Sequence, residues 1–241
     1  ELQAVRTAYG DARRTKLLRS DQFEEELDPE PLGPMMALMT QRGYLSRIPL
    51  ETWTGGQRRK PVRPKGDRRR MDPIIQVVRV DGGQRIAGMT SEGRLFGIDL
   101  DRIPVHEGQE RGIHLSQLYT IEDGETLVGI VPQPDSPTGG LIVATAKGLA
   151  KHISWEAVGS LQRRPVTMIS LDETDRVVGI LTSNQAKTVA LYTQDGHVLL
   201  FAIDRLPPTN REAKAIAAMT LGRNDQVIGL TGTAERRWEM L

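Results

Sequence analysis

The stretch Val143-Ala144-Thr145-Ala146-Lys147-Gly148-Leu149-Ala150 decides the fold, because it is one of four copies of the same phrase. Each copy has an apolar run, a threonine, two variable residues, a glycine and a second run that is apolar or basic. The other copies span residues 37–45, 88–95 and 191–198. The glycines of successive copies (Gly43, Gly93, Gly148 and Gly196) are 50, 55 and 48 residues apart. A repeat of this length, with several strand-like runs per period, is typical of propeller blades or stacked sheets.

Two kinds of strand pair recur in each period. A hairpin is expected at each repeated glycine, because a tight turn needs the positive φ that glycine adopts freely. A second pair is expected around Val177-Val178-Gly179-Ile180, a phrase that returns at 127–130 and 227–230 and more loosely at 74–78. The pattern predicts an all-β, propeller-like fold with about four four-stranded blades, in an open or closed array, over residues 35–241.

The first 34 residues have a different pattern. Leu2, Val5 and Tyr9 fall at helical spacing, which predicts a short N-terminal helix. Residues 21–34 then carry six carboxylates and three prolines, a composition typical of a linker. We therefore expect two parts: 1–34, the helix end of a preceding domain with an acidic linker, and 35–241, the β domain.

The composition indicates the cellular location of the protein and excludes some kinds of site. The 241 residues include no cysteine, which excludes disulfides and thiolate metal sites and agrees with a cytoplasmic location. No apolar run of about 18 residues occurs, so no membrane span is expected, and the start has no signal-peptide pattern. The chain begins with Glu1 instead of methionine, which indicates a fragment of a longer polypeptide, expected to be monomeric.

Basic residues are distributed unevenly, although the net charge is only +1. Eight of the thirteen residues from 58 to 70 are basic, and the Gln57-Arg58-Arg59 loop has counterparts at 109–111, 162–164 and 211–214. Arginine suits phosphate oxygens, so a basic edge that repeats with the blades predicts binding to the DNA backbone. The predicted DNA-binding residues in these loops are Arg58, Arg59, Lys60, Arg63, Lys65, Arg68, Arg69, Arg70, Arg111, Arg163, Arg164 and Lys214.

Three further basic residues, Arg47, Arg94 and Lys151, lie on the second strands of the hairpins and are also predicted to reach DNA. The alternative is that they are solvated strand faces. The histidines share no metal-ligand spacing and are expected at the surface, so no metal site is predicted. Trp155 is expected to pack between blades.

The chain resembles the C-terminal domain of the A subunit of bacterial type IIA topoisomerases, DNA gyrase and topoisomerase IV. The matching stretches are 39–47 and 90–96, the helix-like 9–15, and Gly56-Gln57-Arg58-Arg59, which is similar to the start of that family's Gln-Arg-Arg-Gly-Gly-Lys-Gly box. The resemblance implies a β-pinwheel whose blades exchange strands and whose rim binds and bends duplex DNA. It also implies that the partner is a topoisomerase B-type ATPase subunit, with ATP and Mg²⁺ bound in other parts of the intact enzyme and no cofactor here.

Two departures from the family pattern bear on function. Lys60-Pro61-Val62-Arg63-Pro64 replaces the two glycines of the box, which favours a topoisomerase IV-like or divergent subunit over tight gyrase-type wrapping. Only four repeats are present, where gyrase-like relatives usually have six. No nucleophile–base pair or phosphate-cradling loop is found, so this part of an ATP-dependent isomerase is expected to be non-catalytic.

Other functions remain open from the residues alone. A propeller-like protein-interaction module with an incidental basic loop is the main alternative. A hydrolytic propeller enzyme has little support, because no carboxylate or histidine constellation recurs. The acidic residues Glu24, Glu25 and Glu26 suit a solvated linker, or a decoy that competes with DNA for the basic loop.

Overall fold

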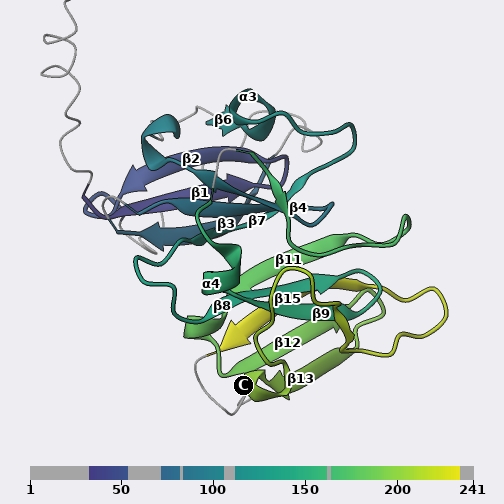
Figure 1. Ribbon diagram of the computed structural model, residues 1–241. Helices are drawn as coiled ribbons and strands as arrows, with labels where there is room; N and C mark the ends of the chain where they lie inside the picture. Colours follow the sequence, from purple (N-terminus) through teal and green to yellow (C-terminus); the bar gives the residue numbers. More distant parts are fainter. Residues whose placement is uncertain (1–32, 54–71, 82–83, 106–111, 162–163, 234–241) are drawn as a thin grey trace, which may run out of the picture. The chain divides into compact units, whose positions relative to one another are not determined.

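Four antiparallel sheets, A to D, make up the part of the chain that the structure describes (Figure 1). The structure is a computed structural model and describes residues 33–53, 72–81, 84–105, 112–161 and 164–233. These residues belong to one unit, Gly33–Leu241. The all-β, propeller-like prediction is confirmed, while the predicted N-terminal helix and acidic linker lie outside the described residues.

Sheets A, B and C have four strands each, and sheet D has three within the described residues. Sheet A has the order β3 (Ile74–Val80), β1 (Met35–Thr40), β2 (Tyr44–Pro49), β6 (Ile113–His114). Sheet B has the order β7 (Leu127–Pro132), β4 (Ile86–Thr90), β5 (Arg94–Ile98), β10 (Val166–Thr167). Sheet C has the order β11 (Val177–Thr182), β8 (Gly140–Thr145), β9 (Leu149–Ser154), β14 (Ile216–Ala217). Sheet D has the order β15 (Val227–Thr233), β12 (Thr188–Thr193), β13 (Val198–Ala202).

Short helical turns connect the strands. They are η2 (Leu100–Arg102), α3 (Leu115–Leu118), α4 (Trp155–Val158), η3 (Ser183–Gln185) and η4 (Ile203–Arg205). α3 and α4 each begin after a capping side chain, His114 in α3 and Ser154 in α4. Such caps satisfy backbone N–H groups that a helix start leaves unpaired.

The fourth strand of each complete sheet comes from the repeat that follows it. β6 leaves the second repeat and pairs with β2 of sheet A, β10 pairs with β5 of sheet B, and β14 pairs with β9 of sheet C. We call β6, β10 and β14 the donated strands. The strand exchange that the resemblance implied is therefore present, and it links each sheet to the next.

The repeated Thr-x-x-Gly phrase builds the hairpin turn of every sheet. In sheet C the Thr145 carbonyl accepts the N–H of Gly148 at 3.0 Å, and its Oγ1 accepts the N–H of Leu149 at 3.3 Å. Both bonds recur in the other three repeats. The hairpin glycines all have φ between +74° and +86°, as the turn requires.

An acidic residue just before the following strand closes the turns of sheets A, C and D. Asp175 Oδ1 accepts the N–H of Lys147 at 3.0 Å, and Asp72 and Asp225 bind the turns of sheets A and D in the same way. In each sheet the first hairpin strand also pairs with the strand that follows the acidic residue. This pairing shifts register at the repeated threonine, which gives a β-bulge in each sheet.

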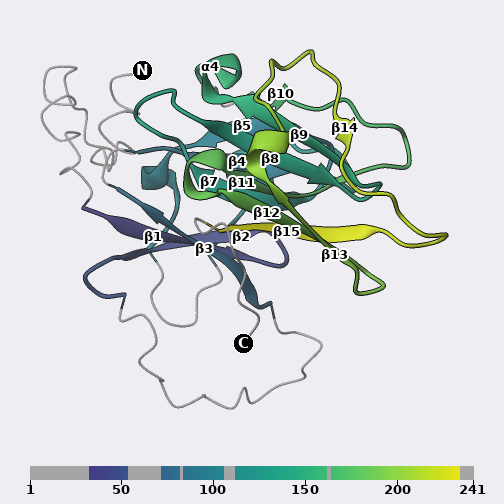
Figure 2. The same cartoon turned by 90° about the horizontal axis from the view of Figure 1, so that it is seen from below.

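β3, β7, β11 and β15 each pair with the first hairpin strand of their sheet, and we call them the inner strands. They contact one another in chain order, β3 with β7, β7 with β11 and β11 with β15 (Figure 2). The glycine of the repeated Val-Val-Gly-Ile phrase permits this approach. A Cβ at Gly179 of β11 would lie 2.5 Å from Leu230 Cδ2 of β15, so a larger residue would force Leu230 to move. At the equivalent position β3 has Gln76, whose side chain bonds the backbone of Ile130 in β7.

Sheet C is covered on both faces, which explains its continuous apolar sequence. Leu141 and Val143 of β8 join a core with residues of sheet B, whereas Ile142 and Ala144 join a core with residues of sheet D. Alternate side chains of a strand point to opposite faces, so a strand between two cores has no polar face. Trp155 is buried in the core between sheets B and C, as predicted.

Candidate nucleic-acid interface

Most of the predicted DNA-binding residues lie outside the described part of the chain. They are Arg58, Arg59, Lys60, Arg63, Lys65, Arg68, Arg69, Arg70, Arg111 and Arg163. Their role in DNA binding stays a prediction. The described candidates are Arg47, Arg94, Lys151, Arg164 and Lys214.

Arg164 and Lys214 occupy equivalent positions in neighbouring sheets. Arg164 lies two residues before the donated strand β10, and Lys214 lies two residues before the donated strand β14. Both side chains are exposed. Because each donated strand is the outer edge of its sheet, the two charges recur at the edges of sheets B and C. Arg111 has the same spacing to β6 in sequence.

Arg94 is held by two carboxylates. Its guanidinium forms ion pairs with Glu122, at 2.9 Å, and with Glu125, whose side chain is fully buried. The hydrogen bond with Glu125 raises the pKa of Arg94 more than burial lowers it. Burial by itself would raise the pKa of Glu125, but hydrogen bonds from Arg94 and Thr90 outweigh it and lower that pKa. A phosphate would compete with these carboxylates for Arg94.

Lys151 requires a correction, because the structure places it in the interior instead of on a solvent-facing strand. It is only 2% exposed, and its Nζ donates to the Met168 carbonyl at 2.8 Å and the Arg211 carbonyl at 2.6 Å. Burial lowers the pKa of Lys151, and the charge of Glu212 opposes that shift. The ammonium group ties the segments after β10 and before β14 to β9, so it is not available to DNA in this structure.

Arg47 is half-buried on β2. Its Nε and Nη1 atoms are buried and have no hydrogen-bond partner. Buried donors are not accessible to an external phosphate, so these two atoms give no support for DNA contact. The role of Arg47 in DNA binding stays a prediction.

The histidines are placed differently from one another. His197 is exposed and lies 3.3 Å from Asp225, whereas His152 is buried and its Nδ1 lies 2.9 Å from the Leu206 carbonyl. The expectation that His152 is a surface residue was wrong, since its strand β9 is covered by the chain leading to β14. Among the described residues no cluster of metal-ligating side chains is found, and no helix there is long and apolar enough to cross a membrane.

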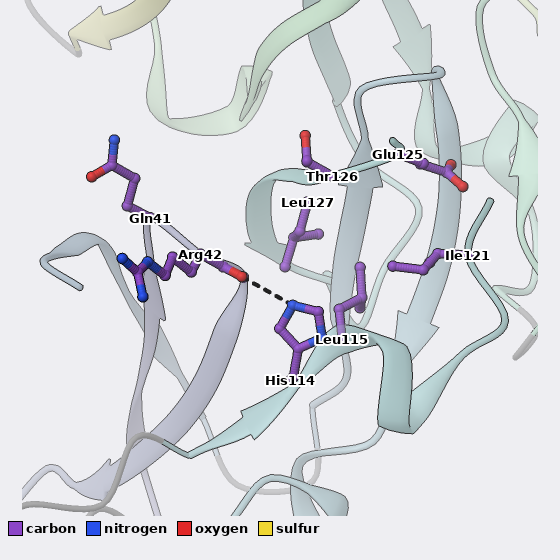
Figure 3. Close-up of a pocket in the computed structure, with 9 residues that line it drawn as sticks. Gln41, Arg42, His114, Leu115, Ile121, Glu125, Thr126 and Leu127 are labelled. Carbon is purple, nitrogen blue, oxygen red and sulfur yellow. Dashed lines mark hydrogen bonds between the residues drawn. The ribbon is translucent and has the colours of Figure 1, made fainter. Parts of the chain in front are cut away.

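A small cavity of about 80 Å³ lies beside the hairpin turn of sheet A. Figure 3 shows His114 pointing to the Arg42 carbonyl, which its Nε2 approaches at 3.0 Å, with Leu115 and Leu127 beside it. The other ring nitrogen lies 2.7 Å from Ser116 Oγ. Nε2 thus holds β6 to the turn while Nδ1 caps α3, so neither ring nitrogen is directed into the cavity for acid–base chemistry.

One further basic candidate was missed in the sequence. Arg205, in η4, is exposed and belongs to an Asp-Arg-apolar-Pro phrase that also occurs around Arg102 in η2. The repetition of this phrase was the signal that could have found it. Its position after the second hairpin strand is the same in both repeats.

The comparisons with known proteins agree with this architecture. The model of a family described as DNA gyrase C-terminal domain, beta-propeller, matches residues 141–184 and 188–231. The DNA gyrase A subunit of Kosmotoga olearia is 29% identical over 96% of this chain, and that of Dehalogenimonas lykanthroporepellens is 25% identical over 95%. The chain spans 29% of the length of each of these relatives.

Solved structures share the fold. A crystal structure of the C-terminal domain of DNA topoisomerase IV matches with a TM-score of 0.65 at 17% identity, covering 84% of this chain and 62% of that one. The E. coli ParC C-terminal domain matches with a TM-score of 0.59 at 20% identity, covering 82% of this chain and 78% of that one. The resemblance predicted from the sequence is confirmed: this chain is similar in sequence to DNA gyrase A subunits and to the gyrase C-terminal β-propeller family, and it shares the fold of the solved C-terminal domains of topoisomerase IV.

Proposed function

We propose that this chain is the DNA-binding and DNA-bending part of the A subunit of a type IIA topoisomerase and contacts the duplex through its sheet edges. The observation that carries the proposal is the recurrence of an exposed basic residue, Arg164 and then Lys214, at the entry of successive donated strands. Cations at regular intervals along a series of sheets suit the regular spacing of phosphates on DNA.

The proposed mechanism is electrostatic. Contacts to phosphates fix the position of the duplex without reading its sequence, so binding is expected to be non-sequence-specific. Bending a site of about 20–30 base pairs costs roughly 1–6 kcal/mol, which must be offset by contacts on several sheets. The bent segment would guide strand passage by the cleavage and ATPase parts of the enzyme.

The cellular setting follows from the same proposal. The intact enzyme would be an ATP-dependent topoisomerase in the cytoplasm whose partner is a B-type ATPase subunit. This domain would have no catalytic activity or cofactor of its own. Loss of the Gly-Gly pair after Arg59 favours the topoisomerase IV-like or divergent type over tight gyrase-like wrapping.

The salt dependence of DNA affinity tests the proposal. Each phosphate contact contributes about −0.9 to the slope of log affinity against log salt, so the double variant Arg164→Ala, Lys214→Ala should flatten the slope by about 1.8. The matched control is Lys187→Ala, Arg223→Ala, which removes two exposed charges that do not precede a donated strand in the sequence. Equal effects of the two double variants would contradict an interface at the sheet edges.

A protein-interaction module is the second candidate, and the exposed apolar side chains of sheet D favour it. Val198 and Leu200 of β13 are 62% and 48% exposed. An interaction module would bind DNA weakly and independently of duplex length. A domain of this kind would bind its protein partner equally well after the two charge-removing substitutions.

A further inference from the structure

A cavity of about 250 Å³ lies at the ends of the inner strands β3, β7 and β11. In sheets A, B and C the inner strand and the donated strand form opposite edges, so this cavity is separate from the sheet edges proposed to contact DNA. Ligand pockets commonly have volumes of roughly 300–1,000 Å³, so a cavity of this size suits a small molecule. Among the residues that line it are Arg79, Asp81, Gln133, Trp155, Thr182 and Asn184.

Two opposite charges lie on the exposed side of the cavity. Arg79 and Asp81 form an ion pair whose side chains are 60% and 59% exposed. Nε and Nη2 of Arg79 both donate to Oδ1 of Asp81, at 3.1 and 3.0 Å, so Nη1 and the carboxylate Oδ2 have no hydrogen-bond partner within the described residues. An exposed ion pair contributes little stability, so both groups can also bind a ligand. The pair therefore offers a cation and an anion side by side.

Two buried polar atoms of residues in the cavity wall lack partners. Trp155 is only 3% exposed, and its Nε1–H has no acceptor in the part of the chain that the structure describes. Oε1 of Gln133 is also buried and has no donor there. The backbone N–H of Gln133 donates to the Arg85 carbonyl at 2.8 Å, which fixes the backbone of this residue. Buried polar groups in folded proteins nearly always have a partner, so an orphaned donor and an orphaned acceptor beside one cavity indicate that a molecule binds in it.

We propose that this cavity binds a small zwitterion of the α-amino-acid class with an amide side chain. The carboxylate of the ligand pairs with Arg79, and its ammonium group pairs with Asp81. A primary amide has a carbonyl acceptor for the indole N–H of Trp155 and N–H donors for Oε1 of Gln133, so one side chain satisfies both buried atoms. Both atoms are covered in this structure, so binding requires a side chain of the wall to rotate, and the half-buried Gln133 has room to do so.

The NMR signals of the indole N–H groups test the site directly. The chain has three tryptophans, Trp53, Trp155 and Trp238, and Trp155→Phe identifies the signal of Trp155 by its loss. The probes are L-asparagine and L-glutamine, whose side chains differ by one methylene group. At least one of them should move the Trp155 signal downfield in a saturable way, with a dissociation constant of about 1 mM or below, while the other two indole signals stay in place.

Two further probes separate the parts of the ligand. L-Leucine keeps the zwitterion and the size of asparagine without the amide, and propionamide keeps the amide without the charges. Each should bind at least about ten-fold more weakly, because each leaves one pair of protein groups without its partner. Arg79→Gln should weaken binding of the amino acid by a similar factor. The matched control is Arg205→Gln, which removes an exposed arginine of η4 that does not line the cavity and should leave binding unchanged.

The outcomes that contradict the proposal are distinct. No saturable shift of the Trp155 signal with either amino acid would overturn the site. Leucine or propionamide binding as tightly as the better amino acid would overturn the ligand class, as would equal binding by Arg79→Gln and the parent. Arg79→Gln should also keep the salt slope of DNA binding, because the inner strands lie at the opposite sheet edge from the donated strands. A flatter slope would assign Arg79 to the duplex and remove it from the ligand site.

Discussion

A threonine and a carboxylate hold each hairpin turn, and this pair of residues explains why the repeat is visible in the sequence. The threonine hydroxyl accepts an N–H from the residue after the glycine and, in sheet A, donates to Asp72 at 2.8 Å. Buried polar groups are stable only when they are hydrogen-bonded, so both partners must be kept together. In sheet B a glutamate, Glu125, takes the acidic position and recruits Arg94 as well.

Removing the charge of Glu125 should destabilise the protein in a pH-dependent way. Glu125→Gln leaves Arg94 without its buried partner, and we expect about 2 kcal/mol less stability at pH 7. The folded-state pKa of Glu125 is below its ordinary value, so its contribution is present above the unfolded pKa of about 4.3 and is lost as the pH falls through the folded pKa. Urea unfolding at a series of pH values should show the variant and the parent converging in acid.

Glu122 is the control for that experiment. It pairs with the same guanidinium, but its side chain is 74% exposed. Glu122→Gln should cost less than about 0.5 kcal/mol, because exposed ion pairs contribute little. A similar loss in both variants would show that burial of Glu125 is not the cause.

Lys151 should matter for stability and not for phosphate contact. Lys151→Met keeps the length of the side chain but leaves the carbonyls of Met168 and Arg211 without their donor, at an expected cost of about 2 kcal/mol. The salt slope of DNA binding should stay that of the parent, whereas Lys214→Ala should flatten it by about 0.9. A flatter slope for Lys151→Met would return Lys151 to the DNA interface.

At the scale of elements, the donated strands determine how tightly each hairpin is packed. The chain after β14 covers the turn of sheet C, where the N–H groups of Ala218 and Met219 both bind the Gly148 carbonyl. The turn of sheet D has no such cover among the described residues. The two turns have the same backbone but different surroundings.

Alanine at the two hairpin glycines should separate backbone strain from packing. Gly148 and Gly196 have φ of +80° and +86°, so either substitution places a Cβ in the left-handed region at a cost of about 1 kcal/mol. Only Gly148→Ala also drives a Cβ against the Met219 carbonyl, so its total loss should be about 3 kcal/mol or more. Denaturant unfolding of both variants checks this, and equal losses would mean that the donated strand does not press on the turn.

At the scale of the whole described unit, basic residues at the entries of donated strands recur from one sheet to the next. Arg164 and Lys214 are two such positions, and residues 58–70 make up the largest basic cluster in the sequence. A single sheet would bind a duplex without bending it. Contacts on several sheets require the duplex to follow their arrangement.

DNA affinity should therefore depend on duplex length. A duplex of about 40 base pairs should bind more tightly than one of about 20, and binding should shorten the distance between its ends, because bending gains contacts on further sheets. Gel shifts and energy transfer between end-labelled duplexes measure the two effects. Length-independent affinity with unchanged end-to-end distance would favour the protein-interaction module.

The sequence by itself determined the period, the hairpins and the all-β class, because the bonds that build them are local. Thr145 and Leu149 are four residues apart, so the phrase that forms the turn is also contiguous in sequence. The acidic turns and the Val-Val-Gly-Ile strands could be recognised for the same reason. The basic positions at 164 and 214 were found because they follow the same period.

Only the tertiary structure decided which sheet each donated strand joins and which charged side chains are buried. A two-residue strand such as Val166–Thr167 has too few residues to show a pattern of its own. Lys151 binds carbonyls 17 and 60 residues away, and His152 binds one 54 residues away, so no local window contains their partners. Burial of these groups is a property of strand exchange between repeats, which brings distant backbone over β9.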